Sequence, residues 1–153
     1  MSEILPRLWL GNERDATNRN FLRDKSISIV VSVEEFPTNW HPTARSRRGH
    51  DTFPSRIERH HFSMRDSQQE ADSPTLLPKL DAIADVIDKT LKDERAVLVH
   101  CSAGKSRSVA CLCYFLVSRR GHTVGRAMQA IKAARPIADP HPAFILRLQR
   151  SYT

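Results

Sequence analysis

The segment VHCSAGKSRS, residues 99–108, places a cysteine shortly before an arginine, with small residues between them. The thiol of Cys101 is a candidate nucleophile, and the guanidinium of Arg107 could hold two oxygens of a phosphate group at once. Small residues at 102–104 let successive backbone N–H groups converge on one point, which makes an anion site. Because helix N-termini and cations favour ionised thiols, we expect Cys101 to be a thiolate that attacks phosphorus.

Gly104, Lys105 and Ser106 also match the end of the loop that binds nucleotide phosphates in many NTPases. That loop requires another glycine five positions before Gly104, and Val99 stands there. Since the turn would lack its first hinge, the sequence favours thiol chemistry over nucleotide binding. A cysteine with a purely structural role, followed by an ordinary helix cap, is the remaining alternative.

Such a loop needs a strand before it and a helix after it, and the flanking sequence predicts both. Residues 96–100 form a short apolar run typical of a buried strand, and residues 106–119 form a mainly apolar helix. Other runs of apolar and β-branched residues predict three more strands, at 8–11, 27–33 and 60–64.

Three more helices are predicted between and after these strands. Apolar residues recur at helical spacing from Leu76 to Leu91, and Ser73 followed by Pro74 predicts the capped start of this helix. Residues 123–135 and the segment from Pro142 onward predict the other two. This alternation indicates an α/β fold with a mostly parallel central sheet flanked by helices in three layers.

The composition suits one domain over residues 1–153, which is long enough to bury a single core. Lysine and arginine number 24 against 17 acidic residues, so a net charge of +7 should attract anions generally. The few aromatic residues are not interleaved with basic ones, so we expect no nucleic-acid partner. Residues 37–59 are rich in arginine and proline; a solvated surface loop is favoured there over a basic flap that holds substrate.

The cysteines of this chain indicate a reducing compartment, and neither a membrane span nor a metal site is expected. Three clustered cysteines, at 101, 111 and 113, make a poor disulfide framework, and no secretory signal is visible, so we expect a cytoplasmic or nuclear location. The longest apolar run, 109–117, is far shorter than the roughly 18–20 residues of a membrane span. No zinc-ligand spacing is present, so we expect neither a metal nor a cofactor.

The segment 99–108 resembles the signature loop of the cysteine-dependent protein phosphatases, in particular the dual-specificity subfamily, whose loops favour Ala-Gly-x-Ser-Arg-Ser. Residues 5–16 are similar to the opening strand and turn of that family, and residues 134–144 to its closing segment. The resemblance therefore covers nearly the whole chain and implies a small atypical member without a docking domain. It departs from the family at three positions, where asparagine, asparagine and glutamine are usual: Ser32, His141 and Arg147.

We expect covalent catalysis in two steps, in which Cys101 forms a thiophosphoryl intermediate that water then hydrolyses. The phosphate oxygens would be held by the Arg107 guanidinium and the backbone of the loop, that is Ser102, Ala103, Gly104, Lys105, Ser106 and Arg107. The resemblance implies that Ser108 contacts the cysteine sulfur and helps it to leave, and that His100 orients the loop.

The leaving oxygen needs a proton, and a carboxylic acid upstream of the loop is the expected donor. Family members carry an aspartate on the loop after their third strand, and Asp66 follows the strand predicted at 60–64. Asp72 is a rival that lies closer to Cys101 in sequence, next to the capping Ser73. We favour Asp66 as the catalytic acid.

Three functions fit these residues. The favoured one is a phosphatase acting on phosphotyrosine and on phosphoserine or phosphothreonine in proteins. Lys105 adds positive charge inside the loop, which would also suit a phosphoinositide, another inositol phosphate or an RNA 5′-phosphate. The third is a module that binds phosphate without turnover.

Cys111 fits core packing better than a redox partnership with the nucleophile.

Overall fold

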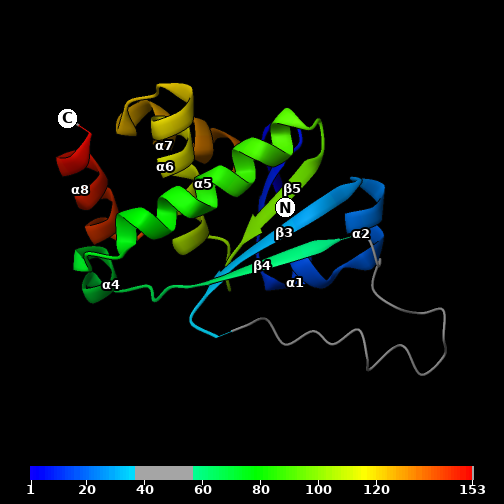
Figure 1. The fold of residues 1–153 in the computed structure, drawn as a ribbon, viewed down its shortest axis with the longest axis horizontal. Helices are drawn as coiled ribbons and strands as arrows, with labels where there is room; N and C mark the ends of the chain where they lie inside the picture. Colours follow the sequence, from blue (N-terminus) through cyan, green and yellow to red (C-terminus); the bar gives the residue numbers. More distant parts are fainter. Residues whose placement is uncertain (37–56, 153) are drawn as a thin grey trace.

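The computed structural model describes residues 1–36 and 57–152, in which a sheet of five strands lies between two layers of helices (Figure 1). The strands lie in the order β1 (Ser2–Leu5), β2 (Leu8–Gly11), β5 (Ala96–His100), β3 (Ile27–Glu34) and β4 (Glu58–Ser63). β1 pairs antiparallel with β2, and the other pairs are parallel. The expected α/β fold is confirmed, with an added antiparallel edge strand, β1.

Helices cover both faces of the sheet (Figure 1). One face carries two short helices, α1 (Glu13–Thr17) and α2 (Arg19–Asp24). The other face carries the rest: α4 (Gln68–Asp72), α5 (Leu76–Lys92), α6 (Arg107–Arg120), α7 (Val124–Ala134) and α8 (Pro142–Ser151). Side chains of β5 alternate between the two cores: Val97 and Val99 join the larger one, whereas Ala96 and Leu98 join the smaller. Burial on both faces explains why this strand is an unbroken apolar run.

Helix α6 lies at the centre of the larger core. Its residues 108–117 are all buried, between α5 and α7 and against the sheet. A helix that is apolar on every side is expected to be buried, and the structure agrees with this prediction from the sequence. It begins one residue later than predicted, and Ser106 takes the cap position.

Two further differences from the predicted boundaries lie on either side of the loop that follows β4 and of helix α4. The strand expected at 60–64 is β4, Glu58–Ser63, so Met64 already belongs to the following loop. The cap predicted at Ser73 is wrong, because α5 begins at Leu76 after Thr75. The Ser73 N–H instead bonds the Glu70 carbonyl and ends α4 (3.2 Å).

The three short helices α1, α2 and α4 were not predicted. Each has only five or six residues, too few to show two turns of apolar periodicity. Their local signal lies in the capping side chains Asn12, Asn18 and Ser67, each of which accepts a backbone N–H of the first turn.

Across the described ranges, none of the helices has the length and apolar character needed to span a membrane. The arginine-rich segment falls largely at residues 37–56, outside the described residues, so its expected role as a loop or a flap stays a prediction.

Candidate active site

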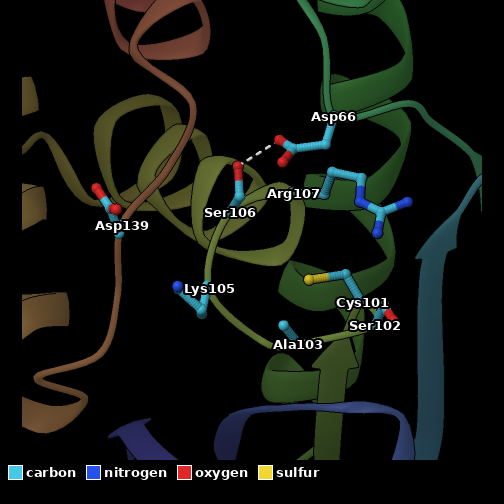
Figure 2. Close-up of a pocket in the computed structure, with 8 residues that line it drawn as sticks. All are labelled: Asp66, Cys101, Ser102, Ala103, Lys105, Ser106, Arg107 and Asp139. Atoms are coloured by element: carbon cyan, nitrogen blue, oxygen red, sulfur yellow. Dashed lines mark hydrogen bonds between the residues drawn. The ribbon is translucent and has the colours of Figure 1, made fainter.

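A pocket of about 320 Å³ lies where β5 gives way to α6 (Figure 2). β5 is central in the sheet, between β2 and β3, and its parallel neighbours end at the same edge. Ligands bind at this edge in open α/β sheets. The pocket is lined by Asp66, Cys101, Ser102, Ala103, Lys105, Ser106, Arg107 and Asp139. The structure therefore brings together the loop and the acid that the sequence singled out.

Four carbonyl groups of the loop are bound from behind by the rest of the protein. The bonds are His100 Nδ1 to the Cys101 oxygen (3.2 Å), Glu13 N–H to Ser102 (3.1 Å), Arg135 Nε to Gly104 (2.7 Å) and Asp139 N–H to Lys105 (2.8 Å). A trans peptide directs its N–H opposite to its carbonyl. The N–H groups at 102, 103, 105 and 106 are therefore directed away from these contacts, an arrangement that suits the expected anion site.

Gly104 is the position where the loop requires glycine. Its φ is +66°, a left-handed conformation that other residues adopt only with strain. A Cβ there would lie 2.6 Å from the Gly11 carbonyl oxygen and 2.5 Å from Nη2 of Arg135. The loop thus packs directly on the end of β2 and on a guanidinium.

Arg135 binds the loop that follows Cys101, a role that the sequence analysis did not assign to it. It is 7% exposed, and its Nη1 also donates to Ser2 Oγ (3.1 Å). The available signal was its place in the segment 134–144, which resembles the closing segment of the family. Its partner in the loop could not be named without the fold, because Gly104 is 31 positions away.

His100 is fully buried at the end of β5, and this burial lowers its pKa to about 4. The ring is therefore neutral at neutral pH. Nδ1 faces the Cys101 carbonyl, which can only accept, so Nδ1 carries the hydrogen and Nε2 accepts. The donor to Nε2 is the Ser32 hydroxyl, at 2.6 Å. Ser32, one of the departures from the family, thus fixes the ring from the neighbouring strand β3.

Cys101 lies at the base of the pocket and is 2% exposed. Its Sγ is 3.0 Å from the hydroxyl oxygen of Ser108, in the first turn of α6. The contact implied by the resemblance is present, and the part of Ser108 in the reaction stays a prediction. Arg107, half-buried, donates from Nη1 to the Met64 carbonyl (3.2 Å), so it also contacts the loop after β4.

Asp66 lies on the loop after β4 and lines the pocket, where its Oδ1 accepts a hydrogen bond from Ser106 Oγ (2.5 Å; Figure 2). The same loop is held by the Arg65 N–H, which donates to Glu70 Oε1 (2.8 Å). Asp72 instead ends α4, and both its carboxylate oxygens accept from Gln68 Nε2 (3.0 Å each). Of the two candidates, only Asp66 lines this pocket.

Asp139 lines the same pocket and was missed by the sequence analysis. It lies with Lys105 on the side away from Cys101 and Arg107 (Figure 2). Both residues are exposed, and the Asp139 N–H bonds the Lys105 carbonyl. Its only sequence signal was its place within residues 134–144. The pocket therefore has an acidic residue on each of two sides.

The other departures from the family have structural partners. His141 caps α8, since its Nδ1 accepts the Ala143 N–H (3.1 Å). Arg147 donates from Nη1 to the carbonyls of Ala71 (2.7 Å) and Ser73 (3.1 Å) at the end of α4. Arg147 thus anchors the helix that follows the Asp66 loop.

The remaining cysteines lie in the core of α6. Cys111 and Cys113 are fully buried free thiols. Burial raises the pKa of Cys113 to about 12 and raises that of Cys111 further. Both are therefore protonated at neutral pH, as expected for packing groups. Within residues 1–36 and 57–152, no three histidine, cysteine or acidic side chains gather closely enough to hold a metal ion.

Comparison with known proteins agrees with this geometry. The family model of the dual specificity phosphatase catalytic domain matches residues 8–153. The chain is 30% identical over 142 residues to dual specificity protein phosphatase 1 of Arabidopsis thaliana, covering 93% of this chain and 64% of that protein. It is 29% identical over 149 residues to dual specificity phosphatase 28 of Mus musculus, covering 97% and 82%. The crystal structure of human DUSP28 is similar with a TM-score of 0.80 at 25% identity, over 98% of this chain and 94% of that one.

Proposed function

The chain belongs to the dual specificity phosphatase catalytic domain family, and on this premise we propose that it hydrolyses phosphotyrosine, phosphoserine and phosphothreonine in proteins. The observation that carries the proposal is the loop around Cys101, four of whose carbonyls are bound by protein donors, which leaves its N–H groups available to an anion. Residues 1–153 would form one catalytic domain.

In the first step the Cys101 thiolate attacks phosphorus, so that an S–P bond forms and the P–O bond to the substrate breaks. The N–H groups of residues 102–107 and the Arg107 guanidinium hold the three remaining oxygens while charge moves through the transition state. Asp66 gives its proton to the departing oxygen. Its place on the pocket wall supports this assignment.

In the second step water attacks the phosphorus and the S–P bond breaks. Asp66, ionised by the first step, takes a proton from that water, so the group that acts as general acid in the first step acts as general base in the second. The Ser108 hydroxyl donates a hydrogen bond to the departing sulfur, which leaves as a thiolate. The distance of 3.0 Å between Ser108 Oγ and Cys101 Sγ supports this role. His100, held neutral by burial, keeps the Cys101 carbonyl turned out of the pocket.

The electrostatics of the pocket support a protein substrate over a polyanionic lipid. Lys105 would attract a second phosphate, but Asp139 lies on the same side of the pocket and would repel it (Figure 2). A single phosphate on a peptide meets Arg107 and the loop amides without requiring a site near Asp139. We therefore favour phosphoproteins as substrates over inositol phosphates and RNA 5′-phosphates.

The test is a phosphate-release panel that compares phosphopeptides, inositol phosphates and a 5′-phosphorylated RNA. Wild type and Cys101→Ser are assayed side by side, and binding is measured by calorimetry. We expect release from phosphopeptides by wild type alone, while Cys101→Ser binds the same peptides without releasing phosphate. Wild type that binds phosphopeptide without ever releasing phosphate would instead indicate a binding module.

A further inference from the structure

We propose that Ser106 is a positioning residue that orients the Asp66 carboxyl and determines which of its oxygens carries the catalytic proton. This inference rests on the proposed function and on the assignment of Asp66 as the acid. Its basis is a pair of hydrogen bonds that join three separate segments at Ser106 Oγ: the loop before α6, the loop after β4 and the start of α8.

The directions of the two hydrogen bonds follow from the chemistry of the groups. The backbone N–H of His141 can only donate, and it lies 2.8 Å from Ser106 Oγ, so the hydroxyl oxygen accepts there. The hydroxyl has a single hydrogen, and that hydrogen points to Asp66 Oδ1, at 2.5 Å. The arrangement permits no other assignment when the carboxyl accepts.

The consequence for Asp66 concerns its two oxygens. Oδ1 already accepts the Ser106 hydrogen, so a proton on Oδ1 would compete with that bond. The proton that Asp66 delivers is therefore carried by Oδ2. Figure 2 shows Oδ2 free of bonds to the residues drawn around the pocket. Ser106 thus leaves the proton on the oxygen that its own hydroxyl does not occupy.

The exposed position of Asp66 makes such a restraint necessary. Asp66 lies on a loop, and its side chain would sample several rotamers unless a partner held it. Within the described ranges, the Ser106 bond is the hydrogen bond that its carboxylate receives. Ser106 is itself half-buried and its Oγ is held by the His141 N–H, so the hydroxyl is a fixed partner that restricts the Asp66 side chain.

Ordinary helix capping does not explain the Ser106 hydroxyl. Ser106 takes the cap position of α6, yet its side chain makes no capping hydrogen bond there. By contrast, the capping side chains of five other helices accept a first-turn N–H: Asn12, Asn18, Ser67, Thr123 and His141. The first-turn N–H groups of α6 thus stay available to a phosphate group, and the hydroxyl serves Asp66.

The first test compares leaving groups, because a proton donor matters most when the departing oxygen is strongly basic. Ser106→Ala is assayed on a phosphothreonine peptide and on an aryl phosphate with an acidic phenol. We expect kcat/KM to fall about tenfold or more on the peptide, and several-fold less on the aryl phosphate. Ser106→Thr, which keeps the hydroxyl, should restore most of the peptide activity. Equal losses on both substrates would overturn the proposal, since they would show damage to phosphate binding alone.

The second test is a double-mutant cycle with Asp66→Asn, run with a thermal unfolding control for each variant. If Ser106 acts through Asp66, adding Ser106→Ala to Asp66→Asn costs no further activity on the peptide. Losses that multiply would contradict the inference. These outcomes are distinct from failure of the proposed function, in which wild type itself would release no phosphate from either substrate.

Discussion

At the scale of single residues, the pocket combines groups of opposite charge around one thiol. Arg107 and the loop amides favour an anion, whereas Asp139 disfavours extra negative charge beside it. Under the proposed mechanism, such a pocket would hold one phosphate group with its ester oxygen pointing toward Asp66. The acid is therefore the residue whose substitution separates binding from turnover.

Asp66→Ala should lower kcat by about 10²- to 10⁴-fold, the usual contribution of a well-placed acid, while phosphate binding persists. Steady-state kinetics on a phosphopeptide, together with binding of inorganic phosphate to the same variant, check this expectation. Asp72→Ala is the matched control, because Asp72, the last residue of α4, accepts from Gln68 of the same helix and does not line the pocket. A nearly inactive Asp72→Ala enzyme beside an active Asp66→Ala enzyme would reverse the assignment.

At the scale of elements, the loop between β5 and α6 is shaped by segments that arrive from across the chain. α1 and Arg135 each bind one of its carbonyl groups, and so does the segment before α8. Gly104 is the point where two close contacts meet, since a Cβ there would collide with both Gly11 and Arg135. Substitution at Gly104 therefore tests the whole arrangement.

Gly104→Ala should lower both stability and kcat/KM, with a loss of activity of at least about tenfold because the loop that carries Cys101 must shift. Gly121→Ala is a matched control, because Gly121 also has a positive φ (+72°) but a Cβ added there would meet nothing within 4 Å. Left-handed strain costs each variant about 1–2 kcal/mol. Only Gly104→Ala must also displace the Gly11 carbonyl. Denaturant unfolding and kinetics on both variants make the comparison, and equal effects on activity would show that crowding at Gly104 is unimportant.

At the scale of the whole molecule, the buried His100 makes stability depend on pH. Burial lowers its folded pKa to about 4, whereas an unfolded histidine titrates near a pKa of about 6.5. As pH falls below about 6.5 the unfolded chain takes up a proton that the folded protein refuses, so stability is lost between about pH 6.5 and 4. The full effect is about 3 kcal/mol.

Urea unfolding at pH 7.5, 6.0 and 4.5 measures this dependence. Because carboxylates also titrate at the acid end, the comparison is with His100→Asn, which should show a flatter loss of stability. Parallel curves for the two proteins would mean that His100 takes up its proton equally well in the folded and unfolded states.

The sequence could predict those parts of the molecule whose signal lies in consecutive residues. The run 96–100, the small residues after it and the apolar helix that follows are contiguous, so their pattern alone predicts strand, loop and helix. Asp66 needed the resemblance as well, because nothing in its own surroundings indicates a catalytic acid. Arg135 and Asp139 lie far along the chain from the groups they bind or face, and only the packing of α7 and α8 brings them there.

Protein groups bind four carbonyls of the loop, so these bonds preorganise its geometry without help from the substrate's organic part. Under the proposed mechanism, the inorganic phosphate released in each cycle would bind the same loop N–H groups and the same Arg107 guanidinium as the ester. Product inhibition of the competitive kind follows, and the turnover of this enzyme should slow wherever free phosphate accumulates.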